Sequence, residues 1–324
     1  MELYKIYKSD LLTSIKVAQK VAGKTGKSTF YHLVDFLLSV VMYGVGPKQY
    51  SEGGFYKLRS FDRKKTYTRQ RRNKLCNLFN DRKYLHFLRN KNEFNEYFKK
   101  FITRDWIYCK TASIEQIEEF LNRNDRVLVK PVDSTKGQGI HELEKDIKGV
   151  GNIANSMVGT DTVLEELLIQ HPQMCYENKS VNTLRITTVL DRDGIAHIIK
   201  TNFRCGIGNS IVDNYSAGGV LYPVNNKYGR IEGPGNNKVL GDAILIHPDT
   251  DFFMIGRDIP YLKEALKLVQ DAAVTIPQVR FVGWDVAILE KGPELIEGNT
   301  LPGEQLIEFQ GLEKGFYKKI MSYL

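Results

Sequence analysis

The chain has 324 residues and a formal net charge of +8; 42% of its residues are hydrophobic and 26% are charged. These proportions exclude a disordered protein and predict a globular chain with two or three lobes. The four cysteines form no Cys-x-x-Cys pair, which argues against a zinc ribbon or a redox-active pair and favours a reducing compartment.

Residues 1–84 predict a basic, mainly helical N-terminal region. Apolar residues between Leu11 and Val21 follow helical spacing, and no hydrophobic stretch typical of a signal peptide precedes them, so we expect a cytoplasmic protein. The longest apolar run, from Phe36 to Val45, is well short of the ~20 residues that cross a bilayer. It predicts a buried helix, with a segment at a membrane interface as the alternative.

Positive charge is concentrated from Lys57 to Lys110, where 17 Lys and Arg residues accompany 5 Asp and Glu residues. Such a stretch attracts a polyanion or an anionic membrane surface, which would allow a peripheral position at the inner membrane face. The alternative is an ordinary solvated helical face. Aromatic residues are interleaved with these charges, but no nucleic-acid-binding motif accompanies them, so we do not expect nucleic acid as a partner.

Helices and strands are expected to alternate in the next part of the chain. An amphipathic helix begins at Lys91, and a capping box at Ser113 opens a second helix. An apolar strand at residues 162–170 carries Glu165 and Glu166 in its middle. One interpretation of this strand is a core strand with an exposed acidic edge.

A loop of small residues follows the strand that ends in Lys130-Pro131. Its glycines, Gly137 and Gly139, let the backbone approach a phosphate group closely and aim N–H groups at it. Lys130 and Lys136 add positive charge. A Gly-x-Gly pair alone is a weak signal, but a lysine and proline at the end of a strand, directly before such a loop, favour phosphate binding.

Two strands after residue 180 carry cations among apolar neighbours. The first contains Arg185, and a turn at Asp193-Gly194 leads into a second strand with Lys200 and Arg204. A buried cation is costly unless it faces an anion, so Arg185 and Arg204 are expected to point at phosphate groups. The following residues, 220–260, are rich in turns.

Two short apolar runs broken near Gly292 predict a β-hairpin at the end of the chain. Folding about Gly292 brings Asp285 opposite Glu297, and Asn299 faces the same way because side chains alternate along a strand. Two such carboxylates repel by roughly 4 kcal/mol at 4 Å with an effective dielectric constant of 20, so we expect a cation between them. Oxygen ligands without nearby His or Cys favour Mg²⁺ or Mn²⁺. The alternative is an ordinary surface hairpin.

In this order the motifs resemble the ATP-grasp fold and, within it, the sugar-transfer-associated ATP-grasp family. The resemblance covers about residues 85–312. Besides Lys130-Pro131 and the glycine loop, it rests on Gln170-His171-Pro172, Val181-Asn182-Thr183-Leu184-Arg185, Val212-Asp213-Asn214, Gly218-Gly219, Gly283-Trp284-Asp285 and Ile296-Glu297-Gly298-Asn299.

The resemblance implies an α+β fold in which two lobes grip ATP. The nucleotide lobe with its glycine-rich flap would occupy residues 85–170, and the C-terminal lobe with the metal site residues 171–324. The basic helical region at 1–84 would be an extension.

The resemblance also implies roles for individual residues. Contacts to ATP are expected from Lys91, Lys130, Lys136, Gly137, Gly139, Glu165, Glu166 and Leu168. Contacts to the metal are expected from Asp285, Glu297 and Asn299. Charge on the transferring phosphoryl group would be offset by Arg185, Arg204 and Lys136. The acceptor would be bound by Arg185, Lys200, Asp213, Asn214, Gly218 and Gly219.

Enzymes with this fold join a carboxylate to an amine through an acyl phosphate, so the resemblance implies an ATP-dependent ligase that forms a C–N bond. The family suggests surface-polysaccharide or capsule biosynthesis, for instance amidation of a uronic acid with an amino acid or amine. Two alternatives stay open. One is a non-catalytic module that binds nucleic acid or lipid and has a vestigial ATP site, and the other is a phosphotransferase with the same fold.

Overall fold

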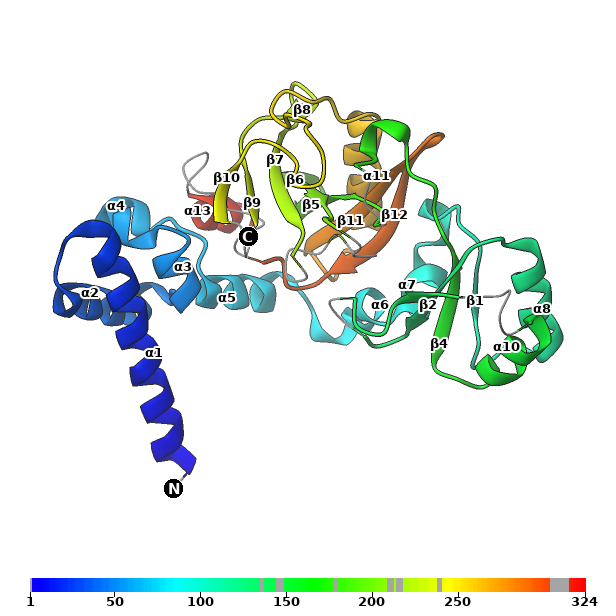
Figure 1. Cartoon of the computed structure of the whole chain (residues 1–324), viewed down its shortest axis with the longest axis horizontal. Helices are drawn as coiled ribbons and strands as arrows, with labels where there is room; N and C mark the ends of the chain where they lie inside the picture. The colour runs from blue at the N-terminus through cyan, green and yellow to red at the C-terminus, as the bar shows by residue number, and fades with distance from the viewer. Residues whose placement is uncertain are drawn as a thin grey trace. The chain divides into compact units, whose positions relative to one another are not determined.

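The computed structural model describes residues 2–134, 137–143, 149–176, 180–208, 213, 218–237, 241–303 and 315–324 (Figure 1). The chain divides into two compact units. We call residues 1–79 with 301–324 the helical unit, and residues 80–300 the two-sheet unit. Lys136 and Asn214, two of the expected site residues, lie outside the described residues. The expected boundaries after residues 84 and 170 stay predictions.

The helical unit confirms the prediction of a basic, mainly helical N-terminal region. Its core contains Val17, Phe36, Tyr50 and Phe55. Its helices are α1 (Glu2–Thr25), α2 (Thr29–Tyr43), α3 (Pro47–Ser51), α4 (Ser60–Arg63), α5 (Arg69–Phe79) and α13 (Phe316–Met321), with a 3-10 turn η1 (Phe55–Lys57).

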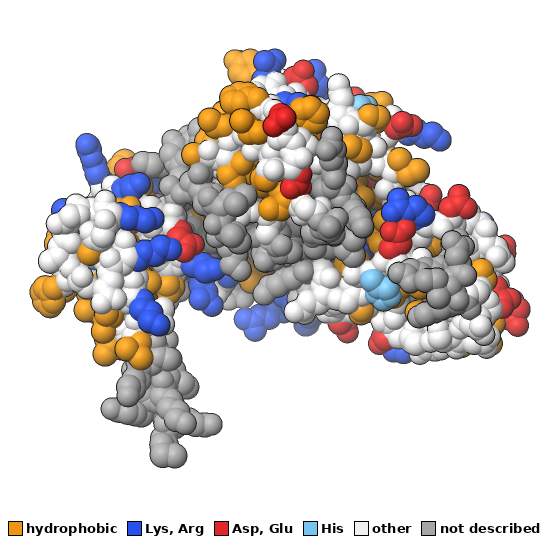
Figure 2. Space-filling model, in the orientation of Figure 1, with side chains coloured by type: hydrophobic (Ala, Val, Ile, Leu, Met, Phe, Trp, Pro, Cys, Tyr) orange, Lys and Arg blue, Asp and Glu red, His pale blue; other side chains and the backbone are white. Residues whose placement is uncertain are grey.

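Helix α2 has clear start and stop signals. The Ser28 side chain accepts a hydrogen bond from the Tyr31 N–H, and Gly44 ends the helix in the left-handed conformation at φ 66°. The expectation that this apolar segment is buried is wrong, because α2 is apolar on two faces and only one of them packs inward. Phe36 is buried, whereas Leu38 and Val41 are exposed. Figure 2 shows such hydrophobic side chains on the surface at the left, over α1 and α2.

Short helices open the two-sheet unit and lead into its smaller sheet. They are η2 (Arg82–Tyr84), α6 (His86–Arg89), α7 (Lys91–Tyr97) and η3 (Lys99–Phe101). The small sheet has four antiparallel strands in the order β1-β4-β2-β3. The strands are β1 (Trp106–Tyr108), β2 (Val127–Pro131), β3 (His141–Glu142) and β4 (Thr162–Glu166).

Two helices, α8 (Ile114–Arg123) and α10 (Val150–Met157), pack on the small sheet around Ile117, Phe120 and Leu164. The predicted capping box is confirmed: the Ser113 hydroxyl accepts from the Gln116 N–H, and the Gln116 side chain accepts from the Ser113 N–H.

Within the described residues, the large sheet of the two-sheet unit has eight strands, with the path β10-β9-β7-β6-β5-β11-β12 and β8 paired to β7. Its strands are β5 (Thr183–Leu190), β6 (Ala196–Cys205), β7 (Val220–Asn225), β8 (Arg230–Ile231), β9 (Gly235–Asn237), β10 (Gly241–Ile244), β11 (Phe281–Leu289) and β12 (Gly292–Asn299). The two predicted hairpins, β5-β6 and β11-β12, are confirmed. Residues 220–260, which were expected to be rich in turns, contain strands β7 to β10. A 3-10 turn, η4 (Pro172–Met174), precedes β5.

Alternation of side chains gives the large sheet an apolar face and a polar face. Trp284 lies opposite Ile186, and both belong to the main core with residues of α11 (Leu262–Thr275). The next residue, Asp285, lies opposite Arg185, which lies opposite Asn202. The polar side chains of the central strands therefore share the face that α11 does not cover.

Candidate active site

Asp285 on β11 is buried and bound by two arginines from neighbouring strands. Arg185 on β5 donates from Nε to Oδ1 and from Nη2 to Oδ2, the latter at 2.8 Å. Arg204 on β6 donates from Nη1 to Oδ2 at 2.5 Å. Burial alone would raise the pKa of Asp285, but the two guanidinium charges outweigh it and hold the pKa well below its usual range.

Arg204 also binds Asp213, whose other carboxylate oxygen accepts from the N–H (2.9 Å) and hydroxyl of Thr183. Burial raises the pKa of Asp213 despite the opposing charge of Arg204. Gly219 lies so close that a Cβ there would be 2.2 Å from the Asp213 carbonyl oxygen. Its neighbour Gly218 has φ 106°, a conformation that favours glycine. The structure thus brings Asp213, Gly218 and Gly219 to Arg204.

Glu297 on β12 lies directly opposite Asp285 in the pairing of the two strands. The Asn299 Nδ2 donates to Glu297 Oε1 at 3.0 Å. Although the Glu297 side chain reaches solvent, the surrounding protein desolvates its carboxylate, and this effect, followed by the Asp285 charge, raises its pKa. The three expected metal ligands are therefore adjacent.

The oxygen donors at this position fit Mg²⁺ or Mn²⁺. When ionised, Asp213, Asp285 and Glu297 together carry one more negative charge than Arg185 and Arg204 offset. Among the described residues, no group of three or more His, Cys, Asp or Glu side chains is arranged to hold a metal ion by itself. A cation here would need further ligands, and Mg²⁺ in proteins commonly takes them from substrate phosphates.

A second buried network links the two sheets through Glu165 on β4. Its carboxylate accepts from Lys130 on β2, from Arg104 Nε at 2.8 Å and from Asn95 Nδ2 at 2.9 Å. Burial alone would raise the pKa of Glu165, but Arg104 and Lys130 outweigh it and lower the pKa well below its usual range. Two of the expected ATP contacts, Lys130 and Glu165, are thus an ion pair.

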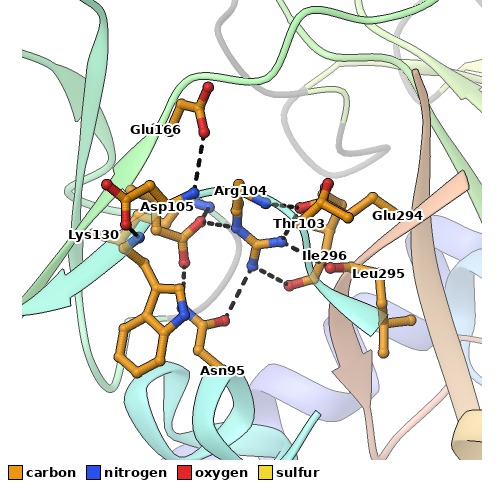
Figure 3. Close-up of polar contacts among 11 residues, drawn as sticks. Asn95, Thr103, Arg104, Asp105, Lys130, Glu166, Glu294, Leu295 and Ile296 are labelled. Atoms are coloured by element: carbon orange, nitrogen blue, oxygen red, sulfur yellow. Dashed lines mark hydrogen bonds and ion pairs between the residues drawn. The ribbon is translucent and has the colours of Figure 1, made fainter. Parts of the chain in front are cut away.

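Arg104, which the sequence did not single out, is the centre of this network (Figure 3). Its Nη1 donates to Glu294 Oε1 and to the Leu295 carbonyl on β12, each at 2.8 Å, and its Nη2 donates to Asn95 Oδ1 at 3.0 Å. Arg104 therefore joins β4 of the small sheet to β12, the strand that carries Glu297. No sequence signal distinguishes it from the many other cations in the basic stretch.

Lys91, at the start of α7, binds the segment that follows β2. Its Nζ donates to the carbonyl oxygens of Pro131 (2.8 Å) and Ser134 (2.7 Å) and to the Ser134 hydroxyl (3.0 Å). Burial lowers the pKa of the Lys91 ammonium, while the charges of Glu297 and Glu165 act in the opposite direction. Lys91 is thus within electrostatic range of both networks.

The glycines beyond this segment form a turn between β2 and β3. Gly137 and Gly139 have φ values of 76° and 73°. A Cβ on Gly139 would lie 2.9 Å from Cγ of Pro131. Both positions therefore favour glycine, as expected for a tight loop.

The remaining expected residues lie at the edges of these networks. Glu166 Oε2 accepts from the Asp105 N–H at 3.0 Å, and Leu168, just after β4, is half-buried. Neither the N–H nor the C=O of Leu168 has a partner within the described part of the chain. Lys200 is buried and paired with Glu232 at 3.2 Å, so its charge is already matched within the protein.

The sequence profile of the family described as sugar-transfer associated ATP-grasp matches residues 70–316. A search of curated proteins finds no significant match.

Several solved structures are similar to the chain. An ADP complex of N5-carboxyaminoimidazole ribonucleotide synthetase is 11% identical, with a TM-score of 0.47 over 74% of this chain and 52% of that one. The ATP-grasp ligase PsnB with its minimal precursor is 13% identical, with a TM-score of 0.46 over 76% and 64%. D-alanyl-alanine synthetase A from Vibrio cholerae is 13% identical, with a TM-score of 0.43 over 73% and 65%. The chain thus matches just over half to about two thirds of the length of these structures.

Proposed function

The chain belongs to the sugar-transfer-associated ATP-grasp family, and we propose that it uses ATP to join the carboxyl group of a sugar to an amine or amino acid. The main support is the pair Asp285 and Glu297 on adjacent strands, beside Arg185 and Arg204. Such a set of charges suits a metal-bound nucleotide and a phosphoryl group in transfer.

The nucleotide would be held mainly by the small sheet. Lys130 offers its charge at the end of β2, oriented by Glu165, and Lys91 fixes the segment that leads to the glycine turn. Main-chain N–H groups of that turn would contact phosphate oxygens. The main-chain N–H and C=O of Leu168, which no described residue binds, suit the edge of an adenine base.

The metal would be held by Asp285, Glu297 and, after rotation of its amide, the Asn299 oxygen. Mg²⁺ or Mn²⁺ bound there would act as a Lewis acid toward phosphate oxygens. The exposure of Glu297 gives a cation access, whereas the buried Asp285 is kept ionised by its arginines.

The reaction would proceed in two transfers. A carboxylate oxygen of the sugar attacks the γ-phosphorus, the bond to the β-phosphate oxygen breaks, and ADP leaves. A neutral amine then attacks the carbonyl carbon, the C–O bond to phosphate breaks, and the amide nitrogen loses a proton to water or phosphate. Arg185 and Arg204 would offset the charge of the transferring group.

The acceptor would bind beside Arg204, near Asp213 and the glycines Gly218 and Gly219. Lys200 and Asn214 are assigned to the same pocket from the family pattern. The family description and the basic stretch at 57–110 support an anionic saccharide as the substrate, in surface-polysaccharide or capsule biosynthesis at the inner membrane face.

The test is to measure ADP release by the full chain with a matrix of uronic acids and amines, followed by mass spectrometry of the products. An amide whose formation needs both partners would support the proposal. A stable phosphate ester that forms without the amine would instead identify a phosphotransferase. ADP release that no pair of substrates changes would leave a binding module as the better description.

A further inference from the structure

The outer face of α2 exposes a continuous stripe of large apolar side chains. Phe30 is 74% exposed, Val41 83% and Met42 60%. At helical spacing these residues and the others of the stripe fall within one face of the helix, because they recur at intervals of three or four. We call this stripe the outer α2 face; its members are Phe30, Val34, Leu37, Leu38, Val41 and Met42.

This stripe is separate from the face that holds α2 in the helical unit. His32, Phe36 and Ser39 are buried on the other side of the helix. Isolated exposed apolar residues are ordinary on protein surfaces, but a contiguous patch of this kind marks an interaction site. We therefore expect the outer α2 face to bind a partner with an apolar surface.

The charge of residues 1–79, which include the stripe, indicates what that partner is. Residues 1–79 contain 16 Lys and Arg but only 5 Asp and Glu. Lys27 lies 4.3 Å over the ring of Tyr31 at the start of α2. The one acid on α2, Asp35, is neutralised by Arg63 at 2.6 Å, so the negative charge of the helix is already matched.

An anionic bilayer matches both properties, apolar in its interior and negative at its surface. A helix of 15 residues is about 22 Å long, shorter than the ~30 Å hydrocarbon layer. None of the described helices is long and apolar enough to cross a membrane. We propose that α2 lies in the plane of an anionic membrane, with its outer face in the acyl region and the basic residues around it at the headgroups. A second copy of this basic unit would instead face like charge.

The test uses the full chain and vesicles, and it does not depend on ATP chemistry. Wild type should sediment with phosphatidylglycerol-containing vesicles, bind phosphatidylcholine vesicles much less, and lose binding at high salt. Val41→Glu combined with Phe30→Glu should lower the partition coefficient at least about tenfold, because two large apolar side chains no longer enter the acyl region.

The control for each single substitution is Val274→Glu, which adds one negative charge to an exposed position of α11 in the other unit, and Val41→Glu alone is compared with it directly. Val274→Glu should leave vesicle binding unchanged. Circular dichroism and thermal unfolding check that the variants are folded. If the double variant does not fold, Val41→Trp gives a second readout: its fluorescence should shift to the blue with anionic vesicles, whereas Val274→Trp should not respond.

Several results would overturn the proposal. One is the absence of binding to anionic vesicles, and another is equal binding by wild type and the α2 variant. A third is a wild-type dimer that the α2 substitutions convert to a monomer without changing vesicle binding, because the stripe would then be an interface between copies of this chain.

Discussion

Two buried arginine–carboxylate networks in the two-sheet unit differ in how completely their charges are matched. Around Arg104, two cations and two carboxylates balance: Arg104 and Lys130 against Glu165 and Glu294. Around Asp285, by contrast, two arginines meet three carboxyl groups, Asp213, Asp285 and Glu297.

The pKa directions of the carboxyl groups also differ between the networks. In the balanced network, Arg104 and Lys130 lower the pKa of Glu165 against the effect of burial. In the other network the two arginines lower the pKa of Asp285, whereas desolvation raises those of Asp213 and Glu297. A network with matched charges is suited to hold two sheets together. A network with excess negative charge, one member of which reaches solvent, is suited to bind a cation.

Breaking the balanced network should have the largest effect. Arg104→Met should lower the free energy of unfolding by about 3–5 kcal/mol, because it leaves buried carboxylates without their partner. Urea unfolding measures this. The control is Arg126→Met, which removes an exposed ion pair with Glu142 and should cost less than about 1 kcal/mol. Equal losses for the two variants would contradict a structural role for Arg104.

Neutralising the exposed carboxylate of the other network should slow catalysis without destabilising the fold. Glu297→Gln should lower the rate of substrate-dependent ADP release by about 100-fold or more, since a bound metal contributes several kcal/mol to such a transfer. Its urea midpoint should not fall. Glu290→Gln, an exposed substitution at the turn of the same hairpin, should keep wild-type activity. A Glu297→Gln enzyme as active as wild type would remove this residue from the site.

The sequence predicts the two networks unequally. Alternation along a hairpin is enough to place Asp285 opposite Glu297, and a cation on an apolar strand is enough to aim Arg185 at an anion. The role of Arg104 could not be predicted because the residue lies in a short connection between η3 and β1. Its partners, Glu165 and Glu294, lie on strands 61 and 190 residues away in the sequence. Tertiary packing, not a local pattern, decides its role.

Other differences from expectation have similar causes. The substrate contact of Lys200 stays a prediction, but its ion pair with Glu232 was not foreseen, because Glu232 lies 32 residues away. The strands β7 to β10 lie in a segment rich in Gly and Asn, where side-chain alternation is weak. Helix α2 was expected to be buried because its composition is apolar, yet composition does not show whether the rest of the chain supplies a second surface to cover it.

The pH dependence of stability should have opposite signs for Glu165 and Glu297, one carboxyl group from each network. The pKa of Glu165 is lowered by folding, so its contribution is present above the unfolded value and is lost as the pH falls. The pKa of Glu297 is raised, so without metal its contribution to stability falls as the pH rises above the ordinary value of 4.5.

Glu297→Gln should therefore gain stability relative to wild type as the pH rises, by less than the effects above because the side chain is exposed. Urea unfolding in a chelating buffer at several pH values measures this difference. If the free energy of unfolding changes with pH equally in the two proteins, folding leaves the pKa of Glu297 unchanged, which would contradict this prediction.

The central claim is that the unbalanced network binds a divalent cation together with a nucleotide. The most direct measurement is electron paramagnetic resonance of Mn²⁺ titrated with the full chain in the presence of ADP. We expect wild type and Glu290→Gln to bind Mn²⁺ equally, and Glu297→Gln to bind it at least about tenfold more weakly, a loss of roughly 1.4 kcal/mol. Equal Mn²⁺ affinity in all three proteins, or no ADP-dependent binding in wild type, would contradict the claim.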